Sequence, residues 1–153
     1  MAGICTKETE SEVKCNPQEI FEMLKHSLHH LPTIFPDVYK HGQVVEGDEK
    51  SLGCVRHLKY VLPGTSEVLS VHIKTLEMDN VNLTLAFEIV EGDLTDHFKH
   101  FVARIQVTPK GEGCTVKWII EYEKHNDEVL DPDNYLGMCV LLNEILDRHL
   151  HKP

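Results

Sequence analysis

The sequence predicts an α+β fold in which a curved antiparallel sheet of seven strands packs against one long C-terminal helix. Residues 38–124 largely alternate apolar and polar side chains, which is the pattern of half-buried strands. Short turn sequences separate these strands and predict an antiparallel meander. Residues 131–150 instead repeat apolar side chains every three and four positions, as an amphipathic helix does.

The C-terminal helix is predicted over residues 131–150. Asp131 is expected at the N-cap and Pro132 at the first helical position, where the missing N–H is tolerated. The apolar stripe comprises Tyr135, Met138, Cys139, Leu142, Ile145 and Leu146. A second apolar row widens this stripe beyond a coiled-coil seam. The helix therefore requires a broad partner surface, which the sheet provides.

The N-terminal segment predicts one strand followed by two short helices. Cys5–Val13 has the composition of a long, partly exposed strand. Asn16 is expected to cap a helix that has Pro17 at its first position and Glu19 three residues after the cap. A second short helix is expected over residues 27–35, where prolines bound or interrupt it. These helices are too brief to form a layer of their own.

Six further strands follow, separated by short turn sequences. They are predicted at Tyr39–Glu46, Gly53–Val61, Glu67–Met78, Val81–Glu91, Asp96–Thr108 and Cys114–Lys124. The turns contain Pro63-Gly64, Asp79-Asn80, Gly92-Asp93 and Pro109 to Gly113, all rich in turn-forming residues. No repeat or linker sequence interrupts the pattern. We therefore expect residues 1–153 to form a single domain.

The charge balance excludes several classes of partner. Asp and Glu outnumber Lys and Arg by 25 to 15, which gives a formal net charge of −10. A chain this acidic is not expected to bind nucleic acid or anionic membrane surfaces, because both require basic side chains. The N-terminus has no signal-peptide pattern, and the five cysteines form no CxxC pair. We expect a cytoplasmic protein, monomeric or weakly dimeric, with reduced cysteines.

The inward faces of the strands predict an internal cavity. One helix cannot completely fill the concave side of a twisted sheet, and the space left over would suit a small hydrophobic molecule. The residues expected to contact this molecule are Phe21, Leu24, Leu31, Leu58, Tyr60, Leu85, Phe87, Ile89, Phe101, Ala103, Ile105, Trp118, Tyr135, Met138, Cys139 and Leu142. No cofactor is expected, because no dinucleotide fingerprint is present.

Candidate catalytic groups are few. Tyr60, His72, Lys99 and Tyr122 are the side chains that could serve as acid or base if the cavity is catalytic. Lys99 follows the inward alternation expected for its strand, whereas the register of His72 is left open. The alternative interpretation, which we favour, is that the tyrosines orient ligands or satisfy core hydrogen bonds and that Lys99 is a surface charge.

A metal site is not expected, although the chain contains 11 histidines. His26, His29 and His30 have helical spacing, but a break between the two short helices is expected near them. No carboxylate or cysteine nearby completes an obvious ligand set. The histidines therefore predict no metal centre.

Several fragments together resemble a known family. They are His29-His30-Leu31-Pro32, Pro36-Asp37, Val90 to Leu94 with Phe98-Lys99, Val107 to Gly113, Val116-Lys117-Trp118 and Glu121 to Lys124. The chain resembles the major latex protein branch of the START-like, pathogenesis-related class 10 superfamily of birch-pollen allergens. The resemblance implies a helix-grip fold with an internal cavity for hydrophobic plant metabolites.

Two functions follow from the resemblance, and both stay open at this stage. Most members are described as intracellular ligand carriers or as defence proteins, whereas a minority catalyse cyclisation, condensation or isomerisation of alkaloid and terpenoid intermediates. The allergen branch has a glycine-rich loop, but residues 47–53 of this chain keep only its end glycines. Asp48 and Glu49 would repel an anion there, so phosphate binding is not expected.

Overall fold

The computed structural model describes residues 3–150 and contains one antiparallel sheet of seven strands in the order β1-β7-β6-β5-β4-β3-β2. The strands are β1 (Cys5–Val13), β2 (Tyr39–Glu46), β3 (Val55–Val61), β4 (Val68–Asp79), β5 (Thr84–Gly92), β6 (Phe98–Lys110) and β7 (Gly113–Lys124). The helices are α1 (Pro17–His26), α2 (Leu31–Ile34) and α3 (Asp133–Leu150), with 3₁₀ turns η1 (Leu28–His30) and η2 (Asp93–Asp96).

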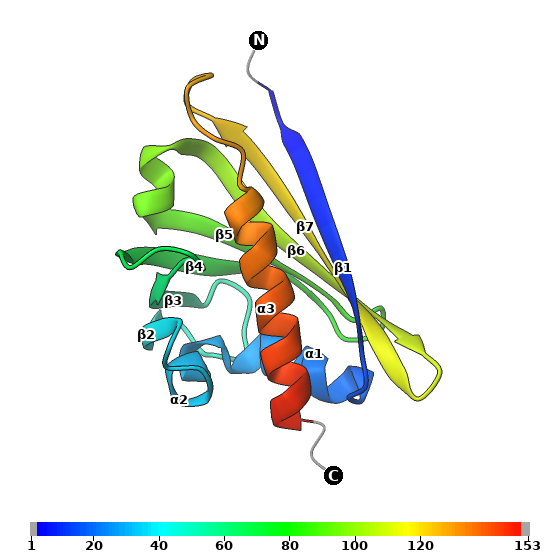
Figure 1. Cartoon of the computed structure of the whole chain (residues 1–153). Helices are drawn as coiled ribbons and strands as arrows, with labels where there is room; N and C mark the ends of the chain where they lie inside the picture. Colours follow the sequence, from blue (N-terminus) through cyan, green and yellow to red (C-terminus); the bar gives the residue numbers. More distant parts are fainter. Residues whose placement is uncertain (1–2, 151–153) are drawn as a thin grey trace.

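The sheet curves around α3, which crosses its inner face (Figure 1). Helices α1 and α2 lie near the C-terminal end of α3, and β1 begins at the end of the molecule opposite to the one where α3 ends. This arrangement confirms the predicted α+β fold with a helix packed on a curved sheet. None of the helices within residues 3–150 is both long and apolar enough to span a membrane.

The first helix begins as predicted, whereas the third does not. Asn16 caps α1, because its side-chain oxygen accepts hydrogen bonds from the backbone N–H groups of Gln18 and Glu19, at 2.8 and 3.3 Å. Asp131 lies two residues before α3 instead of at its N-cap. Its carboxylate accepts hydrogen bonds from Lys124 and from the Tyr122 hydroxyl, which fastens the start of α3 to β7.

Most predicted strand bounds agree with the structure within two residues. The prediction for Val81–Glu91 was wrong at its start, because β5 begins at Thr84. The Asp79 carboxylate accepts hydrogen bonds from the N–H groups of Val81 and Asn82 and extends the turn. The second short helix, predicted over 27–35, is the 3₁₀ turn η1 followed by one turn of α2.

Candidate functional site

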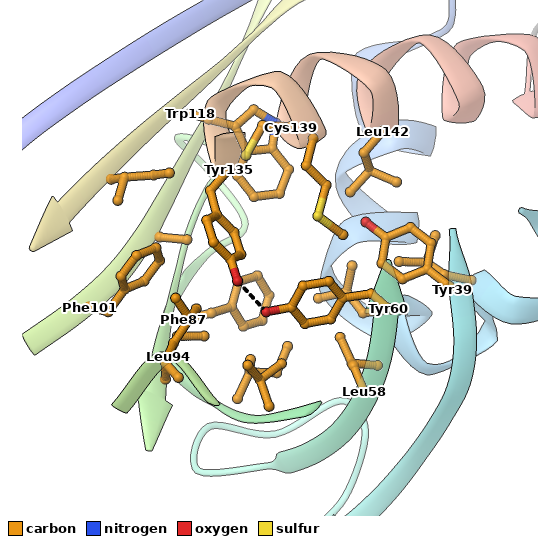
Figure 2. A pocket seen from close by; sticks show the side chains of 18 residues that line it. Tyr39, Leu58, Tyr60, Phe87, Leu94, Phe101, Trp118, Tyr135, Cys139 and Leu142 are labelled. Atoms are coloured by element: carbon orange, nitrogen blue, oxygen red, sulfur yellow. Dashed lines mark hydrogen bonds between the residues drawn. The ribbon is translucent and has the colours of Figure 1, made fainter. Parts of the chain in front are cut away.

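An apolar cavity of about 120 Å³ lies between α3 and the inner face of the sheet (Figure 2). Strands β2 to β7, η1, α2, η2 and α3 supply its wall. The lining residues are Leu28, Leu31, Tyr39, Leu58, Tyr60, Val71, Ile73, Phe87, Ile89, Leu94, Phe101, Ala103, Trp118, Ile120, Tyr135, Met138, Cys139 and Leu142. The lining is aliphatic and aromatic apart from three tyrosine hydroxyls, one indole N–H and one thiol.

The structure brings twelve of the sixteen predicted ligand-contact residues to this wall. Four others, Phe21, Leu24, Leu85 and Ile105, are at most 2% exposed but do not line the cavity. Helix α1 packs against β6, β7 and α3, so this end of the concave surface is filled with side chains. The prediction that these four residues border the cavity was therefore wrong: they belong to solid core.

The sequence interpretation missed six lining residues, namely Leu28, Tyr39, Val71, Ile73, Leu94 and Ile120. Period-two alternation could have found Val71 and Ile73, because both lie on the inner face of β4. Leu94 carried no such signal, since it lies in the 3₁₀ turn η2. A turn has no strand periodicity that would reveal an inward side chain.

Lys99 faces solvent, as the favoured interpretation predicted, although the alternation of its strand would place it inward. The register between β6 and β7 shifts between Phe98 and His100, which is the mark of a β-bulge. As a result both Phe98 and Phe101 are buried, and Lys99 between them points to solvent. Its ammonium group lies 4.0 Å from the Glu123 carboxylate. Lys99 is a surface charge and cannot serve as an acid or base in the cavity.

His72 and Tyr122 are also outside the cavity. His72 lies on the outer face of β4, where its ring stacks on His57 of β3 with centroids 4.5 Å apart. Tyr122 is buried, but its hydroxyl donates a 3.2 Å hydrogen bond to Asp131, which lies in the segment before α3 and outside the cavity. Of the four candidate catalytic residues, only Tyr60 reaches the cavity.

Tyr60 and Tyr135 form a hydrogen bond across the cavity. Their hydroxyl oxygens are 2.5 Å apart, and the bond joins β3 to α3 (Figure 2). Burial and the adjacent Tyr135 raise the pKa of Tyr60, and burial raises the pKa of Tyr135 to about 12. Both phenols are therefore protonated at neutral pH and act as hydrogen-bonding groups.

Replacement of Tyr60 by phenylalanine is expected to lower the free energy of unfolding by about 1–2 kcal/mol, because the Tyr135 hydroxyl loses its partner inside the protein. The double variant Tyr60→Phe/Tyr135→Phe should cost less than the sum of the two single variants. Urea unfolding followed by Trp118 fluorescence measures the free energies of unfolding of the wild type, the two single variants and the double variant. Strictly additive effects would show that the two hydroxyls do not stabilise one another.

A second groove borders the cavity on the side of Tyr135 and Leu94, which line both spaces. Its wall includes four carboxylates, on Glu67, Asp93, Glu128 and Asp131. Asp131 is paired with Lys124 and lies 3.9 Å from Lys7, whereas Glu67, Asp93 and Glu128 form no ion pair with any of residues 3–150. The groove therefore has a negative potential that disfavours anionic molecules.

Arg56 organises a buried polar cluster that the sequence interpretation missed. This side chain is 0% exposed, and its guanidinium donates to the carbonyl oxygens of Lys25, His26 and Glu49 at 2.8–3.2 Å. It also donates to Nδ1 of His29 at 3.2 Å and to the hydroxyl of Thr75 at 3.3 Å. Arg56 thus fastens the end of α1, η1 and the loop of residues 47–53 to the sheet.

The structure brings together a possible metal-ligand set that the sequence interpretation missed. Ligand atoms of His29, His30 and Glu49 lie within 4.8 Å of one another. However, Arg56 donates to Nδ1 of His29, so Nε2 carries the proton of the neutral ring and donates to Glu49 at 3.0 Å. A protonated nitrogen has no lone pair for a metal ion. The chemistry of the donors favours a structural hydrogen-bond chain over a metal centre.

Acidification is expected to weaken the hydrogen bonds that join Arg56, His29 and Glu49. Burial and the neighbouring His30 and Arg56 lower the pKa of His29, so its stabilising contribution is present above the unfolded-state pKa near 6.5 and is lost as pH falls. Replacement by asparagine keeps an acceptor for Arg56 but cannot titrate. Unfolding free energies of the wild type and His29→Asn should therefore converge between pH 7 and pH 5. A pH-independent difference would contradict this role.

The loop of residues 47–53 does not form a phosphate cradle. Three of its backbone N–H groups are already engaged: Lys50 donates to the Asp48 carboxylate, Ser51 to the Asp48 carbonyl and Gly53 to the Thr75 carbonyl, all at 2.8–3.0 Å. Amides that are committed within the protein cannot also surround an anion. The structure thus gives no support for nucleotide or phosphate binding at this loop.

Comparison with known proteins identifies relatives along the whole chain. The family model described as "Pathogenesis-related protein Bet v 1 family" matches residues 2–153. Major latex protein 146 from Papaver somniferum is 38% identical over 143 residues, which cover 92% of this chain and 87% of that protein. MLP-like protein 31 from Arabidopsis thaliana is 34% identical over 152 residues, with 97% and 88% covered.

Solved structures share the fold. Ginseng major latex-like protein 151 from Panax ginseng superposes with a TM-score of 0.91 and 26% identity, covering 97% of this chain and 99% of that one. Truncated norcoclaurine synthase from Thalictrum flavum gives a TM-score of 0.81 at 19% identity, covering 99% and 97%, a likeness that concerns the fold alone. This chain therefore belongs to the pathogenesis-related Bet v 1 family, in its major latex protein branch.

Proposed function

We propose that this protein is a plant carrier that binds small hydrophobic metabolites in the cavity between α3 and the sheet, in defence or specialised metabolism. The observation that supports this most directly is the cavity itself. Its wall is aromatic and aliphatic with a few polar groups, which is the composition of small-molecule sites. Family membership adds support, because the relatives named above are major latex proteins and MLP-like proteins.

The lining favours binding over catalysis. No carboxylate, imidazole or ammonium group of residues 3–150 lines the cavity. The titratable groups that do line it are phenols and the Cys139 thiol, whose pKa burial raises to about 12. General acid–base catalysis near neutral pH needs a group that titrates near that pH. The proposed carrier function requires no such group.

Metabolite binding requires the cavity to enlarge. A volume of about 120 Å³ is below the 300–1,000 Å³ typical of ligand sites. It is also somewhat smaller than an apolar cavity of about 150 Å³ that holds benzene. The Tyr60–Tyr135 hydrogen bond is the contact that joins the sheet to α3 across this space. We infer that larger ligands separate these two hydroxyls as they enter from the adjoining groove. The carboxylates of this groove favour the entry of neutral over anionic ligands.

The state of the cysteines supports action in a reducing compartment such as the cytoplasm. All five cysteines are free, and four of them are buried. Disulfides persist in oxidising compartments and are rare in the cytosol. We therefore propose a cytoplasmic carrier.

A titration with a small neutral arene tests the proposed function. We expect α-methylstyrene to bind saturably and to shift the methyl NMR signals of Val71, Ile120 and Leu142, which line the cavity. Leu69 and Val129 line only the second groove, which borders the cavity, and their methyl signals serve as the internal reference. Shifts confined to that groove, or the absence of saturable binding, would show that the cavity is not the site.

A further inference from the structure

Tyr39 presents to the cavity a hydroxyl that has no hydrogen-bond partner among residues 3–150. The residue is 5% exposed, lines the cavity, and forms no side-chain hydrogen bond with any of residues 3–150. The other hydroxyl and indole groups of the wall are satisfied: Tyr60 and Tyr135 bind one another, and Trp118 donates to Asn143 at 2.8 Å. A wall hydroxyl that has no partner within the protein can bind a molecule in the cavity, as the few polar groups of small-molecule sites do.

The Tyr39 ring is held in place from several sides. It occupies the first position of β2 and lies directly opposite Tyr60 of β3. Its backbone N–H donates to the Phe35 carbonyl at 3.0 Å, and its ring packs edge-on against the Phe35 ring at 6.4 Å. In Figure 2 its hydroxyl points into the cavity between Tyr60 and Leu142. A fixed ring presents its hydroxyl at a defined place in the wall.

The chemistry of this hydroxyl is that of a donor. Burial raises the pKa of Tyr39, so the phenol keeps its proton at physiological pH. The thiol of Cys139 on the facing helix is also protonated and is at best a weak acceptor. A ligand atom with a lone pair would therefore relieve a desolvated donor that the protein itself leaves without a partner.

We propose that the cavity selects molecules whose apolar body carries a hydrogen-bond acceptor at the end beside β2, and that Tyr39 donates a hydrogen bond to this acceptor. Ketones, aldehydes, ethers and phenols supply such an oxygen, whereas pure hydrocarbons do not. This inference rests on the proposed carrier function and names its preferred class of ligand. Tyr39 is then a residue that determines specificity, because analogues without the acceptor leave its hydroxyl desolvated and unpaired.

Acetophenone and α-methylstyrene provide a matched pair of probes, since they differ only by a carbonyl oxygen in place of a methylene group. Calorimetric titration of Tyr39→Phe should show acetophenone binding weakened by about 3- to 10-fold, as expected for one neutral hydrogen bond, with α-methylstyrene affinity unchanged. Tyr122→Phe is the control, because Tyr122 is buried but its hydroxyl contacts Asp131 outside the cavity. It should leave both affinities unchanged.

An infrared measurement gives a second readout, whose first part uses the unaltered protein and so does not depend on the variant's folding. The carbonyl stretching frequency of bound acetophenone should be lower than in hydrocarbon solvent and should rise in the Tyr39→Phe complex. Equal loss of affinity for both probes, no loss for either, or a carbonyl frequency typical of hydrocarbon would overturn the role of Tyr39 while leaving the carrier function intact. Failure of both probes to bind the wild type would overturn the carrier function as well.

Discussion

Replacement of Arg56 by methionine is expected to lower the free energy of unfolding by about 3 kcal/mol, a large fraction of the stability of a typical domain. The side chain is 0% exposed and donates to five acceptors, three of them backbone carbonyls. Methionine has a similar apolar length but leaves these acceptors without a donor inside the protein. Urea unfolding followed by the single tryptophan, Trp118, measures the change.

Two physical effects oppose each other at Arg56. Burial of a guanidinium is unfavourable, and no carboxylate oxygen of residues 3–150 lies within hydrogen-bond or ion-pair distance of it. Against this, two of its acceptors, the carbonyls of Lys25 and His26, lie at the C-terminal end of α1, where carbonyl groups lack helical partners and the dipole favours a cation. We expect the loss of these charge-assisted bonds to outweigh the relief of desolvation.

Arg104→Met is the matched control for Arg56→Met. Arg104 lies on the outer face of β6, is partly exposed, and pairs with Glu77 and Glu121 at 3.2 Å. Because exposed ion pairs contribute little, its replacement should cost less than about 1 kcal/mol. Equal costs for the two arginine variants would contradict the assignment of Arg56 as the centre of a buried network.

Replacement of Ala103 by phenylalanine is expected to weaken the binding of small arenes at least about tenfold. Ala103 lies on β6 between Phe87 and Ile120, its neighbours across the sheet, and all three line the cavity. The added phenyl ring is the size of benzene and occupies the space that a ligand needs. Calorimetric titration with α-methylstyrene measures the loss.

Gln106→Phe is the control for Ala103→Phe, because Gln106 is exposed on the outer face of the same strand. It introduces the same ring without entering the cavity and should leave the affinity unchanged. The unfolding free energy of Ala103→Phe should stay within about 2 kcal/mol of the wild type, since filling an apolar void offsets part of the strain of overpacking. A folded Ala103→Phe variant with wild-type affinity would contradict the cavity as the binding site.

The overall fold could be predicted because its signals are periodic and local. Alternation defined six strands, and three- and four-residue spacing defined α3, from Asp133 to Leu150. Helical spacing placed four wall residues on α3, and strand alternation placed seven more, because the inner face of a strand is fixed by its period. Strand alternation failed at Lys99, where a bulge at the start of β6 reverses the alternation, and a bulge leaves no clear mark in the sequence.

The remaining features depend on tertiary contacts. Arg56 occupies one strand position and would ordinarily be read as a solvent-exposed charge, because its acceptors come from four separate elements: α1, η1, the loop of residues 47–53 and β4. Glu49 reaches His29 across 20 residues of sequence for the same reason. Phe21 and Leu24 were predicted as cavity wall because apolar periodicity shows that a residue is buried but not whether a void lies beside it.

A crystal structure of the protein with bound α-methylstyrene tests the central claim most directly. We predict that the ligand lies between α3 and the sheet, in contact with Phe101, Trp118 and Leu142, and beside the Tyr60–Tyr135 pair. Ligand found only in the outer groove formed by η2 and the segment before α3, with this cavity unchanged and empty, would contradict the account.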